Sequence, residues 1–228
     1  MSNKQADVAV MDQYLRADTA PAMERPRTAL AHVAPAVRHA SESGAGDDGN
    51  PARHTADGAL SLEEKPVTGL LTLRAGAHRE SLATALSATL GLVLPERLSS
   101  ESAGNEVCVR WMSPDEWLLS CPLQDAFDLE CRLRSAIDGH IAIVNVSGGY
   151  SILNLSGSAA QNVLKKSTAY DVHPDNFMPG KVVNTLMAKA QVVLRCVESD
   201  RYEIIVRRSF ADYLWLWLQR AGREHDLR

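Results

Sequence analysis

The stretch EVCVRWMSPDEWLLSC, residues 106–121, predicts a β-hairpin at the centre of the fold. Glu106–Trp111 and Trp117–Cys121 are short runs of apolar residues that include β-branched and aromatic side chains, which is typical of strands. Met112–Asp115 lies between them and contains a Pro-Asp pair, which favours a tight turn. We therefore expect two neighbouring antiparallel strands here.

The segments on either side of this hairpin complete a first folded unit. Before it, Gly69–Arg74 predicts a strand and His78–Leu90 a helix, because leucines recur at every fourth residue and a glycine follows directly. After it, Leu123–Ile137 predicts a helix and Ile141–Val146 a β-branched strand. The order strand, helix, strand, strand, helix, strand is the ferredoxin-like split βαβ pattern. We assign this first α+β unit to residues 61–147.

A second mixed α/β unit is expected over residues 148–228, ending in a C-terminal helix. Its expected elements are a strand at Tyr150–Leu155, a short helix from a cap at Ser158 to Leu164, a polar loop at Thr168–Gly180, strands at Val182–Met187, Gln191–Val197 and Tyr202–Val206, and a helix from a cap at Ser209 to about Arg220. The fold class of the whole chain is therefore predicted to be α+β.

Residues 1–60 differ in composition from the rest of the chain. They are rich in Ala, Asp, Gly, Ser, Pro and Arg, and Tyr14 is the only aromatic residue before Trp111. Such a segment buries too little apolar surface to offset its ordering entropy. We expect a largely disordered N-terminal extension with a short helix near Val8–Leu15; the alternative is that it lies along a partner.

The overall composition is that of an ordinary globular protein. The chain has 228 residues, 45% of them hydrophobic and 23% charged, and a net charge of −4, which argues against a nucleic-acid partner. No apolar run is long enough to span a membrane, and the N-terminus lacks the pattern of a secretory signal. The four cysteines form no C-x-x-C pair, so we expect buried free thiols in a cytoplasmic protein, with metal ligands or disulfides as the alternative.

A search for catalytic and cofactor motifs leaves no complete site. Neither a G-x-G-x-x-G fingerprint nor a P-loop is present, and no two histidines lie four residues apart as in a helical zinc site. His173 follows Asp171 and could act as a general base, but a structural role in its loop is the expected one. We predict no catalytic, cofactor-binding or metal-binding residue in this chain.

Three other sites have plain structural explanations. Ser147 precedes two glycines but does not form the G-x-S-x-G nucleophile motif. Lys165 and Lys166 lie at the end of a short helix, where they complement the helix dipole. Asp115 is expected to cap the hairpin turn rather than to act together with Glu116.

The last predicted helix offers a candidate partner interface. At 100° per residue, its core-facing side should comprise Phe210, Leu214, Trp217 and Ala221, flanked by Tyr213 and Leu218. Trp215 would then point away from the core, with Leu216 beside it. Because tryptophan is enriched at binding hot spots, we predict that Trp215 and Leu216 are partly exposed and contact a partner subunit. The alternative is that another segment of this chain covers Trp215.

Several stretches of the sequence together resemble the gamma subunit family of bacterial heterotetrameric sarcosine oxidase. The resemblance spans roughly Leu70 to Leu218 and is carried by Ser113–Leu119, Val144–Ser147, Leu155–Gly157, Ala169–Pro174 with Phe177, Pro179-Gly180, and Val206–Leu214. The Asp-x-His-Pro loop and the Arg-Ser-Phe-Ala-Asp-Tyr helix start are the more specific elements. The resemblance does not cover the N-terminal extension.

Membership of this family would imply a fold related to the folate-binding domains of glycine-cleavage T-proteins. It would also imply a heterotetramer of alpha, beta, gamma and delta chains that oxidatively demethylates sarcosine to glycine, a step of sarcosine catabolism and one-carbon metabolism. In that family FAD, FMN, NAD, tetrahydrofolate and zinc are bound by the partner subunits, and the gamma chain chiefly contacts alpha. This chain would then be a non-catalytic subunit that supports assembly of an oxidoreductase complex.

Two alternatives to this function stay open from the sequence. One is a stand-alone folate-binding, T-protein-like one-carbon protein, although no K-G-C-Y-x-G-Q signature is visible. The other is an adaptor subunit of a different N-methyl amine oxidase.

Overall fold

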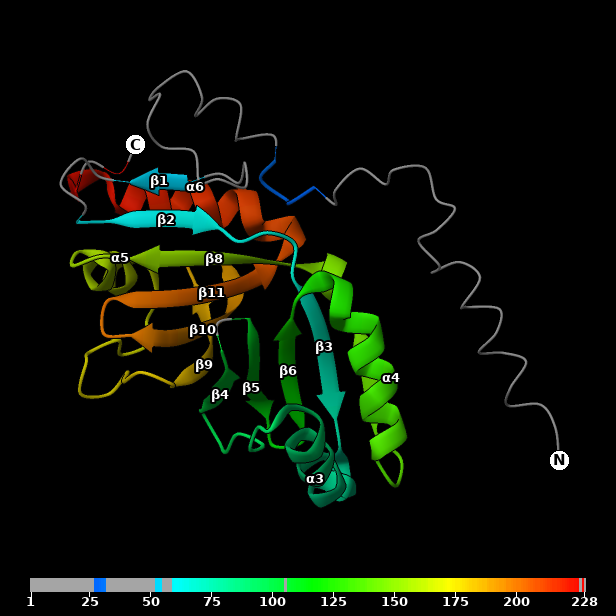
Figure 1. Cartoon of the computed structure of the whole chain (residues 1–228). Helices are drawn as coiled ribbons and strands as arrows, with labels where there is room; N and C mark the ends of the chain where they lie inside the picture. The colour runs from blue at the N-terminus through cyan, green and yellow to red at the C-terminus, as the bar shows by residue number, and fades with distance from the viewer. Residues whose placement is uncertain (1–26, 32–51, 55–58, 105, 226, 228) are drawn as a thin grey trace, which may run out of the picture.

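Two antiparallel sheets lie face to face, and each is covered by two helices on its outer side (Figure 1). The structure is a computed structural model that describes residues 27–31, 52–54, 59–104, 106–225 and 227. Its layers run helix, sheet, sheet, helix, so that apolar side chains fill three cores: one beneath each pair of helices and one between the sheets. The α+β fold class is confirmed.

The first sheet has five strands and contains the predicted hairpin. In pairing order its strands are β4 (Ser100–Ala103), β5 (Val107–Ser113), β6 (Glu116–Cys121), β3 (Gly69–Arg74) and β7 (Ala142–Asn145). Helices α3 (Arg79–Leu90) and α4 (Ala126–Ala136) follow β3 and β6. The pairing β5-β6-β3-β7 is the ferredoxin-like arrangement predicted from the order of elements. The polar edge strand β4 is additional.

The second sheet has six strands. In pairing order they are β1 (Ala52–His54), β2 (Ser61–Glu64), β8 (Tyr150–Ser156), β11 (Arg201–Arg207), β10 (Ala190–Glu198) and β9 (Val182–Met187). Its outer face carries α5 (Ala160–Ser167) and α6 (Ala211–Ala221). Short 3₁₀ helices occupy Gly76–His78, Leu123–Asp125, Ser147–Gly149, Arg208–Phe210 and Arg223–His225.

The sequence predicted the ends of the helices only in part. Gly91 ends α3 with φ of 66°, a left-handed conformation that glycine adopts without a steric penalty, and its N–H donates to the carbonyl of Ser87 at 2.9 Å. The predicted caps Ser158 and Ser209 are wrong, because α5 and α6 begin later. Their N-cap residues are Ala159 and Phe210, which make no side-chain cap.

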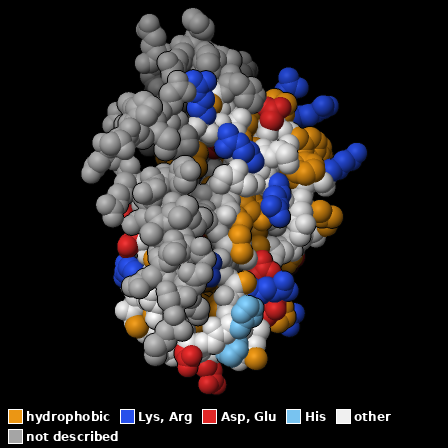
Figure 2. All heavy atoms as spheres, turned by 90° about the vertical axis from the view of Figure 1, so that its right-hand side faces the viewer, with side chains coloured by type: hydrophobic (Ala, Val, Ile, Leu, Met, Phe, Trp, Pro, Cys, Tyr) orange, Lys and Arg blue, Asp and Glu red, His pale blue; other side chains and the backbone are white. Residues whose placement is uncertain are grey.

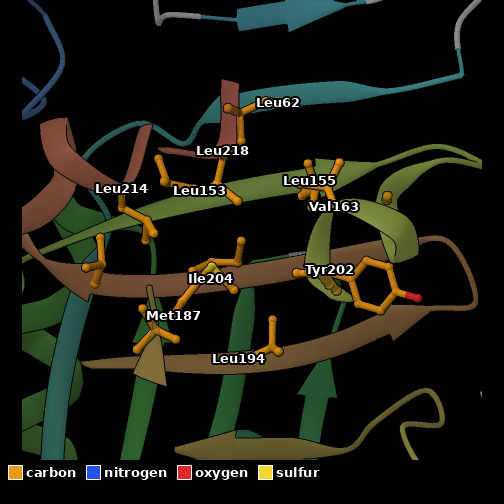
Figure 3. Packing of buried hydrophobic residues seen from close by; sticks show 14 of the residues in the cluster. Leu62, Leu153, Leu155, Val163, Met187, Leu194, Tyr202, Ile204, Leu214 and Leu218 are labelled. Carbon is orange, nitrogen blue, oxygen red and sulfur yellow. The ribbon is translucent and has the colours of Figure 1, made fainter. Parts of the chain in front are cut away.

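The largest core lies between the six-stranded sheet and helices α5 and α6. Every second residue of these strands points into this core, and Figure 3 shows Leu153 and Leu155 of β8 beside Ile204 and Tyr202 of β11, together with Leu214 of α6. The residues between them face the other sheet. Ile152, Val193 and Ile205 meet Leu70 and Leu118 in the smaller inter-sheet core.

The third core lies under α3 and α4. Leu82 and Leu86 of α3 pack there against Trp117 of β6, whose indole nitrogen donates to the carbonyl of Pro95 at 3.0 Å. On this side of the molecule, Figure 2 shows hydrophobic side chains interspersed with Lys and Arg side chains. None of the described helices is long and apolar enough to cross a membrane.

Part of the N-terminal extension belongs to the folded core. Leu30 and Leu60 are fully buried in the core that α5 and α6 cover, and the backbone N–H of Leu30 donates to the carboxylate of Glu64 at 3.2 Å. The expectation of disorder is therefore wrong for these residues, because their leucines complete the apolar layer. The predicted helix at Val8–Leu15 lies outside the described residues.

The first described strands of the chain belong to the second unit rather than to the first. β2, which the sequence places in the first unit, pairs antiparallel with β8 of the second unit, with Leu62 opposite Leu155. Only after Pro66 does the chain enter the five-stranded sheet. The second unit thus includes a segment that precedes the first unit in the sequence.

Candidate functional site

A buried ion pair joins the inner faces of the two sheets. Arg110 of β5 lies between Val109 and Trp111, which pack with the core under α3 and α4, so strand alternation directs Arg110 inward. Glu203 of β11 is directed inward in the same way. Arg110 donates to Glu203 Oε1 from Nε at 2.8 Å and from Nη2 at 2.5 Å, and both side chains are almost completely buried.

Two further cations contact the same carboxylate. Lys65 Nζ lies 3.2 Å from Glu203 Oε2, and Arg195 Nη1 lies 3.9 Å from Oε1. Burial alone would raise the pKa of Glu203, but the charges of Arg110, Lys65 and Arg195 outweigh burial and hold this pKa at about 2. Glu203 therefore stays ionised at any ordinary pH.

The remaining donors of Arg110 are satisfied inside the five-stranded sheet. Its Nη1 donates to Ser120 Oγ at 3.0 Å and to the carbonyl of Cys108 at 3.2 Å. Burial disfavours its charged form, whereas the adjacent Glu203 raises the pKa of Arg110 above its usual value. The guanidinium is thus a fixed positive charge that bridges strands β5, β6 and β11.

This cluster forms one wall of a cleft of about 380 Å³ between the sheets. The cleft is lined by Lys65, Ser102, Gly104, Glu106, Cys108, Arg110, Ser120, Asn154, Arg195, Val197, Arg201 and Glu203. A general base works best when its pKa lies near the operating pH, and a carboxylate with a pKa of about 2 does not meet that condition. The arrangement is suited to holding charge rather than to moving a proton at Glu203.

Sequence reasoning did not single out these four charged residues. A detectable signal existed, because Arg110 and Glu203 each interrupt an apolar run in the middle of a predicted strand. Charged residues are rarely buried without a partner, so two such interruptions favour an ion pair between the strands. The sequence alone does not say which charges meet.

His173 lies in the predicted loop, away from this cleft. The side-chain oxygen of Asp171 accepts a hydrogen bond from the backbone N–H of His173 at 3.0 Å, so Asp171 does not orient the imidazole as a catalytic carboxylate would. The ring Nδ1 instead accepts from the backbone N–H of Asp175 at 3.3 Å. These contacts are those of a residue that shapes its loop.

The other residues considered from the sequence make local contacts. Asp115 accepts hydrogen bonds from Ser113 Oγ at 3.0 Å and from Arg74 Nε at 3.2 Å, which agrees with its predicted role in the turn. Ser147 Oγ accepts from the N–H of Leu70 at 2.9 Å and is buried. Lys166 contacts the carbonyl of Ala221, the last residue of α6, and Glu224 just beyond that helix.

The cysteines do not gather at one site. No disulfide joins the four cysteines; Cys108, Cys121 and Cys196 are buried as expected, whereas Cys131 is exposed. Burial raises the pKa of Cys121 and of Cys196 to about 11. Within the part of the chain that the structure describes, no three His, Cys, Asp or Glu side chains gather as a metal site would require.

The predicted exposure of Trp215 is wrong. Trp215 is 0% exposed and packs with Ala211, Leu214 and Leu218 on the inner face of α6. The register of the helix explains the difference: α6 begins only at Ala211, and Phe210 lies in the preceding 3₁₀ turn, outside the core. Leu216 is 56% exposed, as expected.

Comparison with known proteins agrees with the fold and with the motifs in the sequence. The chain matches the model of the sarcosine oxidase gamma subunit family over residues 74–224. It is 31% identical over 201 residues to the sarcosine oxidase subunit gamma of Corynebacterium sp. (strain U-96), covering 87% of this chain and 90% of that protein. The sarcosine oxidase subunit gamma of Arthrobacter sp. is 30% identical over 185 residues, covering 77% of this chain and 90% of that protein.

Comparison with solved structures agrees with the family match. A chain of the heterotetrameric sarcosine oxidase from Corynebacterium sp. U-96, in complex with pyrrole 2-carboxylate, is 29% identical with a TM-score of 0.73, covering 90% of this chain and 98% of that one. The glycine cleavage system aminomethyltransferase T from Bartonella henselae is 16% identical with a TM-score of 0.51, covering 72% of this chain and 46% of that one. This second likeness concerns the fold alone, and it agrees with the expected relation to T-proteins. By its family match and its relatives, the chain belongs to the sarcosine oxidase gamma subunit family.

Proposed function

We propose that this chain is a structural subunit of a heterotetrameric sarcosine oxidase and supports assembly of the complex that demethylates sarcosine to glycine. Family membership supports this proposal, as does the likeness to a chain of a heterotetrameric sarcosine oxidase over 98% of that chain. The proposed partners are alpha, beta and delta subunits, chiefly alpha, in the cytoplasm. The reaction itself would take place on those partners.

The observation that carries the assembly role is an apolar ridge along α6 and the turn before it. Phe210 is 46% exposed, Leu216 56%, and Tyr213 and Trp217 36% each. Tyr213, Leu216 and Trp217 lie three, six and seven residues after Phe210, so the four residues share one side of the helix, next to the buried face. We name these four residues the α6 ridge.

The ridge has the composition of a protein contact. Aromatic residues are enriched where two proteins meet, and clustered exposed apolar side chains mark interaction surfaces more often than isolated ones do. Trp217 is anchored by a hydrogen bond from its indole nitrogen to Ser167 Oγ at 3.2 Å, which fixes the ring at the junction of α5 and α6. The interface role predicted for Leu216 is kept in this proposal, and Trp215 supports the ridge from beneath.

We further propose that the cofactors of the complex, FAD, FMN, NAD, tetrahydrofolate and zinc, are held by the partner subunits. The sequence of this chain has no dinucleotide fingerprint and no P-loop, which supports that assignment. Calorimetric titration of the purified full-length chain with tetrahydrofolate or FAD should accordingly show no tight binding. Stoichiometric binding of either compound would contradict this part of the proposal.

The assembly role is tested by charging the ridge. Tagged wild-type chain, Leu216→Asp and the control Val93→Asp are each co-expressed with the alpha, beta and delta chains and purified by the tag. Val93 is 73% exposed and lies away from α6, so its variant controls for an added surface charge. We expect Leu216→Asp to recover at least about tenfold less partner protein, because a carboxylate would be desolvated in the contact.

The same preparations show whether the variant chain is folded. Leu216 is largely exposed, so its substitution should leave the melting temperature of the isolated chain within about 2 °C of the wild-type value. Recovery of the partners equal to wild type, together with normal flavin absorbance of the complex, would show that the ridge is not the contact.

A further inference from the structure

The cleft between the sheets holds more positive charge than its buried carboxylate neutralises. Three cations, Lys65, Arg110 and Arg195, contact the single carboxylate of Glu203, which leaves an excess of two positive charges. At the rim, Arg201 and Glu106 add one charge of each sign. The excess is notable because the chain as a whole carries a net charge of −4.

Arg110 alone already provides the structural link between the sheets. It makes two hydrogen bonds to Glu203 and is 1% exposed, so the inter-sheet contact does not require Lys65 or Arg195. The side chains of Lys65 and Arg195 are 35% and 13% exposed and line the open cleft. Holding like charges together in a partly dehydrated site is unfavourable unless another anion offsets them.

Arg195 is oriented toward this space by its own contacts. Its Nε donates to Ser100 Oγ at 2.9 Å and its Nη2 to Ser102 Oγ at 2.7 Å, both on the edge strand β4. Its Nη1 makes the 3.9 Å ion pair with Glu203 but donates no hydrogen bond to any of the described residues. A guanidinium that is held in place by two hydrogen bonds and still has a donor nitrogen available is suited to bind an oxyanion.

We propose that this cleft binds a small doubly charged oxyanion, of the phosphate or dicarboxylate class. The excess of two charges matches a dianion, and Asn154 and Ser102 add neutral hydrogen-bonding groups to the wall. A volume of about 380 Å³ lies at the lower end of the range of small-molecule sites, which favours a metabolite-sized ligand over a peptide. The proposal goes beyond the assembly role and concerns a different face of the chain from the α6 ridge.

The test is calorimetric titration of the full-length chain with inorganic phosphate, succinate and acetate at constant ionic strength. We expect saturable binding of phosphate or succinate, and the stronger of the two identifies the ligand class; acetate, with one charge, should bind at least about tenfold more weakly. Arg195→Gln should weaken the binding about tenfold or more. If Arg195→Gln does not fold, Lys65→Gln replaces it in the test, and we expect the same loss of affinity. Arg132→Gln is the matched control, because Arg132 is exposed on α4 and its loss changes the net charge equally.

Three results would overturn the proposal. The first is the absence of saturable heat at roughly 10 mM of either dianion. The second is an equal loss of affinity in Arg132→Gln, which would indicate general attraction to the surface. The third is binding by the free chain that disappears in the assembled complex, which would assign the cleft to an acidic segment of a partner. The titrations of the free chain need no partner, so their failure is distinct from a failure of the assembly role.

Discussion

Arg110 and Glu203 lie 93 residues apart in the sequence, yet two guanidinium nitrogens of Arg110 share one oxygen of Glu203 between the two sheets. Both side chains are at most 2% exposed, so neither charge has water as an alternative partner. A buried ion pair is costly to form, but breaking one by removing a single partner costs more, because the other charge stays buried. The two sheets are therefore tied together by a contact that tolerates little change.

Replacing Glu203 with Gln should destabilise the chain by about 3–5 kcal/mol, because Arg110 would be left without a counter-charge. The free energy of unfolding is measured by urea denaturation. Glu198→Gln is the control: this carboxylate pairs with Arg201 at 2.7 Å, but its side chain is 62% exposed, so its loss should cost no more than about 1 kcal/mol. A cost under about 1 kcal/mol for Glu203→Gln would contradict the role given to the pair.

The stability of the chain should fall at acid pH in a window set by Glu203. The pKa of this carboxyl is lowered on folding from 4.5 to about 2, so it stabilises the folded state above its ordinary pKa. That contribution, roughly 3 kcal/mol, is lost as the pH falls from about 4.5 through about 2. In urea denaturation between pH 6 and pH 2, the free energy of unfolding should fall more steeply for wild type than for Glu203→Gln. Equal slopes would mean that Glu203 does not contribute.

Leu30 should be needed for full stability, although it lies in a segment of low apolar content. Its side chain is 0% exposed, so Leu30→Ala should lower the free energy of unfolding by about 2–5 kcal/mol. Deleting residues 1–56 should lower it as well, since the deletion also removes β1 from the edge of the sheet. Val93→Ala, at a side chain that is 73% exposed, should change stability by less than about 0.5 kcal/mol. An unchanged melting temperature for Leu30→Ala would show that this segment does not pack in solution.

Trp215 should act within the chain rather than at an interface. Trp215→Ala should destabilise the isolated chain by about 3–5 kcal/mol through loss of packing under α6. Trp215→Phe should cost less, because the buried indole nitrogen has no hydrogen-bond partner among the described residues and its removal leaves nothing unpaired. Thermal unfolding of both variants separates these costs. A cost for Trp215→Phe close to that of Trp215→Ala would indicate that the indole nitrogen has a partner.

His173→Asn should leave the turnover of the assembled complex with sarcosine within about threefold of wild type. An asparagine oxygen can accept the same hydrogen bond from the backbone N–H of Asp175 that the imidazole Nδ1 accepts now. The measurement is a steady-state assay on complexes of equal subunit content. A hundredfold loss with intact assembly, about 2.7 kcal/mol of barrier, would require a catalytic role for His173.

The sequence by itself determined the features that depend on near neighbours. Two apolar runs around a Pro-Asp turn predicted β5 and β6, and a leucine stripe with a closing glycine predicted α3. The order of elements predicted the ferredoxin-like sheet. Short motifs also identified the family, which the comparisons confirm. These signals are local because helix and strand periodicities repeat within a few residues.

The tertiary structure decided which distant segments meet. Leu214–Leu218 are five consecutive apolar residues, so more than one face of α6 could be buried. Only the packing of α6 on the six-stranded sheet, in a core that also contains Leu30 and Leu62, decides that Trp215 is buried. The four-residue strand β2 is half acidic and finds its partner β8 almost ninety residues later. The meeting of Arg110, Lys65 and Arg195 at Glu203 likewise requires both sheets to be in place. Such contacts form because every buried charge and apolar surface must be satisfied at once, and that condition belongs to the whole chain rather than to any of its segments.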